Sequence, residues 1–215
     1  GPKLRFPDGK LQEAGGIIWQ DASGWNYGRA DDPTRPQYSY VREADYVSGA
    51  ALMVRRSLWQ DLEGFDETFA PAYYEDTALC FAARRAGYQV LYQPASSVVH
   101  YEGVSNGTDL AAGQKQYQLV NQQRFLDKWQ RELDAFHFPN GEQVNWARDR
   151  SRGKTSVLVI DHYVPHYDKD AGSRSTWMYI ELMVEMGWRV QFIGANFFPH
   201  QPYTEKLQQL GVEVL

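Results

Sequence analysis

The sequence predicts an α/β protein in two parts: a mixed-sheet domain, then a small parallel, Rossmann-like α/β unit. Two observations predict this fold class. The first part is organised around a strand–helix–loop–helix–strand block at residues 45–100. From residue 155, strand and helix patterns alternate, which is typical of parallel strands joined by right-handed crossovers. We therefore expect a first domain at 1–134, a linker at 135–154 and the start of a second domain at 155–215.

Composition narrows the classes of function. The net charge of −5 and the absence of a long basic run argue against a nucleic-acid partner. Cys80 is the single cysteine, so we expect a reducing, cytoplasmic environment. No apolar run approaches the roughly 18 residues of a membrane span, and we expect no signal peptide. Peripheral association with the inner face of the membrane stays open.

The first forty residues predict short strands and a long loop. Strand patterns flank a Pro-Asp-Gly turn and reach Ile17–Trp19. Gly1-Pro2 is either a scar from an expression tag or native, and we favour native. Residues 21–42 follow no period, which in a compact domain is typical of a functional loop, and aromatic residues such as Trp25 argue against disorder. Asp31-Asp32 favours a turn over a metal site, because a proline follows it.

The central block predicts a strand that leads, through two loops, to paired carboxylates. Tyr46–Val54 is apolar, with small residues at its centre that let a backbone or a ligand come close. A turn at Gly64–Glu67 and an aromatic loop at Phe69–Tyr74 follow. The loop brings Glu75 and Asp76 to the start of a helix.

That helix is predicted at 77–86, with Gly87 in the left-handed position after its end. Its expected apolar face consists of Leu79, Ala82, Ala83 and Ala86. Asp76 has two interpretations. It is either the helix N-cap, or a general base or hydroxyl-binding group paired with Glu75. In the second case the positive end of the helix would keep Asp76 ionised.

Four motifs in order carry a resemblance to a known family: DYVSGAALMVRR, GFDE, YYED and GYQVLYQPASSVVHYEG. Together they resemble the acceptor half of family 2 glycosyltransferases with the GT-A fold, over roughly residues 1–133. The resemblance implies that Asp76 is the catalytic base and that His100 helps to hold a divalent metal, Mn²⁺ or Mg²⁺. Without it, a histidine at a strand end is more often structural. The family's donor-binding half, with its own DxD metal motif, precedes the acceptor half and is missing from this sequence.

The resemblance implies an inverting, metal-dependent sugar transfer from a nucleotide-diphosphate donor to a saccharide acceptor, in cell-surface polysaccharide or glycan synthesis. Glu75 would hold the acceptor, Gly49 and Ala50 would let it approach, and aromatic rings would stack on the sugars, namely Tyr73, Tyr74 and Trp25. The alternative is a non-catalytic carbohydrate-binding or scaffold module that retains the acceptor surface. We expect the chain alone to be inactive, as part of a longer enzyme. An open sheet edge would favour self-association. Donor sugar, acceptor, linkage and oligomeric state are not predicted.

The rest of the chain predicts a closing helix, a linker and the second unit. Leu110–Leu133 has a helical pattern with an apolar stripe, namely Tyr117, Val120, Phe125 and Trp129. In 135–154 the interleaved acidic and basic residues indicate a solvated linker. Residues 155–215 resemble the opening of a GT-B, family-4-like glycosyltransferase. Asp168-Lys169-Asp170 is a DxD, but it follows the acceptor half, so we do not interpret it as the metal motif. Pro165 separates His162 from His166 and argues against paired ligation.

Overall fold

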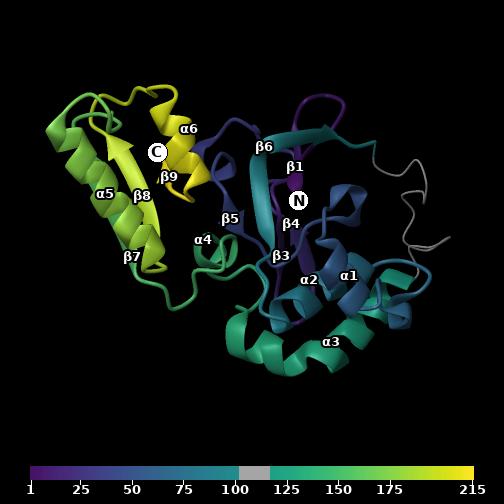
Figure 1. Cartoon of the computed structure of the whole chain (residues 1–215). Coiled ribbons are helices and arrows are strands. Elements are labelled where there is room, and N and C mark those ends of the chain that lie inside the picture. The colour runs from purple at the N-terminus through teal and green to yellow at the C-terminus, as the bar shows by residue number, and fades with distance from the viewer. Residues whose placement is uncertain (102–116) are drawn as a thin grey trace. The chain divides into compact units, whose positions relative to one another are not determined.

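The computed structural model describes residues 1–101 and 117–215 (Figure 1). It has a mixed α/β fold, as the sequence predicts. The chain divides into two compact units, Gly1–Pro33 with Glu43–Arg152 and Thr34–Arg42 with Gly153–Leu215. The first residues of the predicted 110–133 helix lie outside the described residues. In the part of the chain that is described, no helix has both the length and the apolar character that a membrane span requires.

The sheet of the first unit is mixed, in the order β2-β1-β6-β5. β1 (Pro2–Arg5) pairs antiparallel with β2 (Leu11–Glu13) and parallel with β6 (Leu91–Val99), with Leu4 opposite Val98. β5 (Arg42–Glu43) has only two residues. β3 (Gly16–Ile18) and β4 (Gly24–Asn26) form a separate antiparallel hairpin, so the predicted loop at 21–42 contains a strand.

The helices of the first unit are α1 (Arg56–Asp61), α2 (Glu75–Arg85), α3 (Tyr117–Phe136 in the described part) and α4 (Val144–Ala147). Short 3₁₀ turns occupy Gly49–Ala51 and Glu67–Phe69. α2 ends before Gly87, whose φ of 85° confirms its predicted left-handed conformation. In Figure 1, α2 and α3 lie beside each other, and ring contacts of Phe81 with Phe125 and Trp129 join them.

The two predicted apolar faces are confirmed in part, because Leu79 and Ala83 of α2 and Phe125 and Trp129 of α3 are buried. On α2 the buried residues are Thr77, Ala78, Leu79, Cys80, Phe81 and Ala83, whereas Ala86 is exposed. On α3 a buried stripe spaced by four residues consists of Asn121, Phe125, Trp129 and Leu133, while Val120 is 48% exposed. Phe81, which was not predicted for the face of α2, is buried because its ring packs against Phe125 and Trp129 of α3.

The predicted strand at Tyr46–Val54 is also wrong. Tyr46 makes one isolated bridge to Gly16, and the 3₁₀ turn Gly49–Ala51 follows. The reason lies in the backbone donors. The N–H of Ser48 donates to Glu13 Oε1 (3.2 Å) and that of Gly49 to Asp76 Oδ2 (2.7 Å). Side-chain carboxyls satisfy amides that a strand would have bonded to a neighbouring strand.

The predicted solvated linker at 135–154 is corrected as well, because the structure includes the segment in the first unit as far as Arg152. His137, Arg148, Asp149 and Ser151 are buried there. Alternating acidic and basic residues in this segment indicated exposure to solvent, yet their side chains bond to buried groups of the protein. Arg152, for example, donates to the carbonyl of His137 at 2.6 Å.

The second unit contains the separate small parallel sheet that the sequence predicts. β7 (Ser156–Asp161), β8 (Arg189–Gly194) and β9 (Glu213–Val214) lie in that order, with Val159, Phe192 and Val214 side by side. Helices α5 (Ala171–Glu185) and α6 (Tyr203–Gln209) contribute Trp177, Ile180 and Leu207 to its core. β7 is only half-buried, because Leu158 and Ile160 point away from that core and are 50% and 68% exposed.

Candidate functional site

The loop before α2 holds two tyrosines in an unusual backbone conformation. Tyr73 and Tyr74 have φ values of 72° and 73°, in the left-handed region. For residues other than glycine, such conformations cost on the order of 1 kcal/mol each and persist only when surrounding contacts impose them. Tyr74 occupies the N-cap position of α2, so Glu75 and Asp76 are the first two helical residues. The interpretation of Asp76 as the N-cap is therefore wrong.

Asn121 of α3 imposes much of this loop conformation. Its side chain is fully buried, and its Nδ2 donates to the carbonyls of Phe69 (2.8 Å), Ala72 (2.8 Å) and Tyr73 (3.0 Å). An amide has two N–H donors for these three acceptors, so one bond is shared. Asn121 was not predicted from the sequence as a residue of the site. A polar residue four positions before Phe125, within an apolar stripe, was the available signal.

Tyr74 forms a wall of the site and is itself held in place. Its ring packs against Phe125 (5.3 Å between centroids), and its hydroxyl donates to the carbonyl of Ala22 at 2.8 Å. Burial, followed by the charges of Asp21 and Asp76, raises the pKa of the Tyr74 hydroxyl. These contacts anchor the loop, while the Tyr73 side chain stays partly exposed.

Asp76 lies between the start of α2 and the Gly49–Ala51 turn. Its Oδ2 accepts from the N–H of Gly49, and its Oδ1 accepts from the N–H (2.6 Å) and hydroxyl (3.2 Å) of Thr77. Burial raises the pKa of Asp76 in spite of these bonds. A raised pKa makes the carboxylate a stronger base.

Glu75 is the neighbouring carboxyl, and its Oε2 is buried with no hydrogen-bond partner among the described residues. Burial and then the charge of Asp76 raise its pKa. A buried oxygen without a partner is costly and often marks a position where a ligand binds. Glu75 can therefore accept a hydrogen bond from a hydroxyl group brought next to Asp76.

Gly49 and Ala50 are exposed at the same place, on a 3₁₀ turn rather than on the predicted strand. A Cβ on Gly49 would lie 3.4 Å from both Cβ and Oδ2 of Asp76. The structure thus places Gly49 next to Asp76, although the two residues are far apart in the sequence. Glu75 adjoins Asp76 at the start of α2.

Trp25 and His100 make their contacts elsewhere. Trp25 lies edge-on to Trp19 at 4.9 Å, and a Cβ on Gly141 would contact its ring. His100 follows β6, its N–H donates to the carbonyl of Arg5 (2.9 Å), and its Nδ1 lies 3.2 Å from Gln12 Oε1. This partner leaves Nε2 as the atom that could bind a metal. Within residues 1–101 and 117–215 no three His, Cys, Asp or Glu side chains form a metal-binding group.

A second carboxyl near Asp76 was also missed. Glu13, on β2, is 2% exposed, and burial raises its pKa to about 8. Its Oε1 accepts the N–H of Ser48, the residue before Gly49. No periodic or motif signal marks Glu13 in the sequence.

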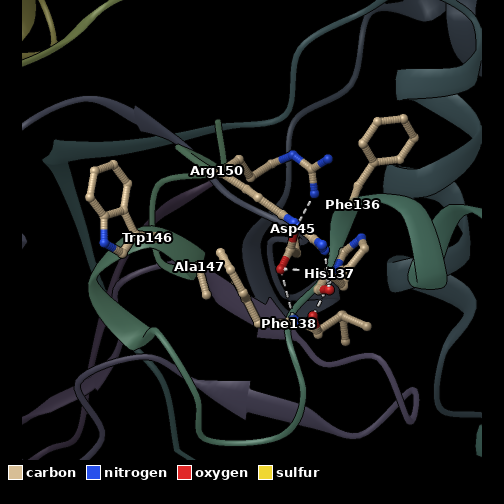
Figure 2. Close-up of a pocket in the computed structure, with 9 residues that line it drawn as sticks. Asp45, Phe136, His137, Phe138, Trp146, Ala147 and Arg150 are labelled. Carbon is tan, nitrogen blue, oxygen red and sulfur yellow. Dashed lines mark hydrogen bonds and ion pairs between the residues drawn. The ribbon is translucent and has the colours of Figure 1, made fainter. Parts of the chain in front are cut away.

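A separate charged cluster surrounds Asp45, next to a cavity of about 60 Å³ (Figure 2). Asp45 accepts from the N–H of Ile18 (2.9 Å) and pairs with Arg150, while His137 Nδ1 lies 3.5 Å from Oδ2. Burial opposes ionisation, but His137, Arg150 and Arg84 outweigh it and hold the pKa of Asp45 well below its usual range. The cluster ties the 137–152 segment to the rest of the first unit.

The carboxylates of the DxD in the second unit have partners within that unit. Asp170 is the N-cap of α5 and accepts from the N–H and hydroxyl of Ser173, both at 2.7 Å. Asp168 accepts from the hydroxyl of Tyr203 at 2.6 Å. The ring of His166 stacks on that of Tyr203 at 4.4 Å.

Comparison with known proteins identifies a similar family for the region that carries Asp76 and His100. Residues 27–118 match the family described as "Glycosyltransferase like family 2". An N-acetylglucosaminyl-diphospho-decaprenol L-rhamnosyltransferase of Mycobacterium tuberculosis is 28% identical over 127 residues, which are 52% of this chain and 40% of that protein. An uncharacterized protein of Sinorhizobium fredii is 29% identical over 112 residues, 50% of this chain and 12% of that protein.

The chain thus spans less than half the length of either relative. No solved structure matches it. The similarities support glycosyl transfer in general. The family match covers Asp76 and the loop before it, whereas Glu13 and Trp25 precede the matched region.

Proposed function

We propose that residues 1–134 form the acceptor side of an inverting glycosyltransferase of the GT-A type. Asp76 acts as its base. The observation that carries the proposal is the Glu75–Asp76 pair inside the matched region. Asp76 is a carboxyl with a raised pKa, and beside it Glu75 has a buried oxygen without a partner in the described chain. Carboxyl groups with raised pKa values at the start of a helix, behind a loop held in a fixed shape, are typical of acid–base chemistry.

In the proposed mechanism, Glu75 Oε2 accepts a hydrogen bond from the acceptor sugar and orients it. Asp76, in its ionised form, takes the proton of the reacting acceptor hydroxyl. The freed oxygen attacks the anomeric carbon of the donor, and the bond from that carbon to the diphosphate breaks with inversion. The Gly49 N–H keeps Asp76 Oδ2 in place during this step.

A divalent metal, Mn²⁺ or Mg²⁺, would stabilise the charge of the leaving diphosphate. Of the described residues, His100 is the proposed ligand, and it fits only as one member of a larger set that includes oxygen ligands. In the full-length enzyme His100→Ala should raise the metal concentration needed for half-maximal rate. An unchanged metal titration with a lower melting temperature would make His100 structural.

The relative from Mycobacterium tuberculosis is named as a rhamnosyltransferase of a diphospho-decaprenol-linked sugar. Nucleotide-linked deoxyhexoses as donors and lipid-linked diphosphate sugars as acceptors are therefore the first compounds to test. The other predictions stay predictions: the family-4-like identity of 155–215, a cytoplasmic location, peripheral membrane association and self-association through a sheet edge.

The decisive experiment replaces Asp76 by Asn in the full-length protein. Loss of a general base should lower the transfer rate by about a hundredfold to ten-thousandfold. The exposed Asp61 provides a matched control, Asp61→Asn, with unchanged rate. Normal turnover of the Asp76 variant would refute the base assignment. A full-length protein that binds glycans but transfers no sugar would favour the alternative, a non-catalytic binding module.

A further inference from the structure

Two carboxyls from different elements, the buried Glu13 and the half-buried Asp76, hold one short turn. Ser48, Gly49 and Ala50 are consecutive, and the first two direct their N–H groups to Glu13 and Asp76 respectively. The third amide closes the turn, because Ala50 N–H donates to Ser48 Oγ at 3.2 Å. The turn is therefore hydrogen-bonded on one side to Glu13 of β2 and on the other to Asp76 of α2.

The geometry couples the two carboxyls through rigid covalent units. Successive amides belong to planar peptide groups that rotate only about the φ and ψ bonds between them. A shift of Ser48 toward or away from Glu13 therefore also moves the Gly49 N–H, which donates a hydrogen bond to Asp76 Oδ2. The Asp76 side chain has few other anchors, because its remaining bonds go to the adjacent Thr77.

The electrostatic surroundings favour a neutral Glu13 near pH 7. Burial raises its pKa to about 8; the Ser48 N–H opposes this, the charge of Asp76 adds to it, and the amino group of Gly1 opposes it. Tyr46 also faces both Glu13 and Asp76, and Cys80 faces Asp76. A neutral Glu13 accepts the Ser48 N–H without placing a second negative charge beside the base.

We propose that Glu13 is a positioning residue for Asp76, acting through the Ser48–Gly49 turn. This inference rests on the proposed function, since it assumes that Asp76 is the base. Glu13 acts at a distance from the reacting atoms: it fixes the turn, and the turn fixes Asp76 Oδ2. Removal of the Glu13 carboxyl lowers the rate of transfer more than it weakens substrate binding.

The test compares Glu13→Ala, Glu13→Gln and Asp76→Asn in the full-length protein, with the donor and acceptor that support turnover. Glu13→Ala leaves the Ser48 N–H unpaired and should lower kcat about tenfold to a hundredfold, as expected for a displaced catalytic group, with little change in KM. Glu13→Gln retains a neutral acceptor and should restore most of the rate at pH 7. In the wild type, the rate should change as Glu13 ionises near pH 8, and Glu13→Gln should lack that inflection.

The outcomes separate the two proposals. Full activity of Asp76→Asn overturns the proposed function, whatever the Glu13 variants do. If Asp76→Asn is inactive and Glu13→Ala keeps its kcat, the positioning role is refuted. It is equally refuted if Glu13→Gln shows the wild-type inflection near pH 8. Should Glu13→Ala fail to fold, the pH profile of Glu13→Gln decides alone, because a purely structural glutamate would lower stability without moving that profile.

Discussion

Each unit of this protein carries a pair of carboxylates at or just before the start of a helix, and their environments are opposite. Glu75 and Asp76, in the first unit, have raised pKa values because burial disfavours their charged forms. Asp168 and Asp170, in the second, have lowered pKa values because hydrogen bonds stabilise the charge, from Tyr203 and from Ser173 respectively. The second pair forms the DxD motif, whereas the first pair has the raised pKa values that suit a base. The burial of the carboxylate and the hydrogen bonds that it accepts, rather than the spacing of acidic residues in the sequence, distinguish a candidate base from a helix cap.

The largest expected effect is on the rate of sugar transfer. Asp76→Asn in the full-length enzyme should lose about a hundredfold to ten-thousandfold in rate, whereas Asp168→Asn should leave the rate unchanged because its partner is Tyr203. Steady-state assays of both variants in one preparation measure the contrast. A comparable loss in the two variants would mean that the DxD of the second unit takes part in the chemistry.

A second prediction contrasts the buried Asp45 with the half-buried Asp76, two aspartates of the same unit. Asp45 is buried beside Arg150 and Arg84, so Asp45→Asn leaves these guanidinium groups without a compensating charge and should cost about 3–5 kcal/mol of stability. Asp76→Asn removes a charge without a buried cationic partner among its bonds, and we expect a change of about 1 kcal/mol. Urea unfolding of this chain measures both values. Equal destabilisation would contradict the contrast.

A third prediction concerns Glu13 and pH. Its pKa is raised from 4.5 to about 8, so between these values the folded state binds more protons than the unfolded state. Stability that is fully present below pH 4.5 should therefore fall as pH rises, by up to about 1.4 kcal/mol per pH unit, and stop falling above about pH 8. Glu13→Gln should flatten this dependence, with Glu67→Gln, on the exposed surface, as the control. Parallel unfolding curves for wild type and Glu13→Gln at every pH would show that Glu13 is ionised in the fold.

The smallest effect is expected at Asp170. Asp170→Ala removes the N-cap of α5 and should lower the melting temperature slightly, without changing transfer in the full-length protein. Asp170→Asn keeps the cap and serves as the matched variant. A loss of activity in Asp170→Asn at an unchanged melting temperature would give this exposed pair a functional role.

The sequence by itself determined the elements whose information is local. Alternating strand and helix patterns predicted β7, α5, β8, α6 and β9, because apolar periodicity and glycine stops act within a few residues. Local order also marked the Glu75–Asp76 pair at the start of a helix and the left-handed Gly87. Motifs in family order placed the predicted chemistry in the region that the family match covers.

Only the tertiary structure decided how the site is held together. Asn121 meets the carbonyls of Phe69 and Tyr73 from about fifty positions further along the chain, and Glu13 meets the turn at Ser48 from 35 positions earlier. Such hydrogen bonds depend on which elements pack side by side, and they override strand propensity at 46–54 by satisfying its amides with carboxyls. The segment at 135–152 changed from an expected linker to a buried part of the first unit for the same reason: Arg150 reaches Asp45 across 105 positions, and no local pattern records that partner.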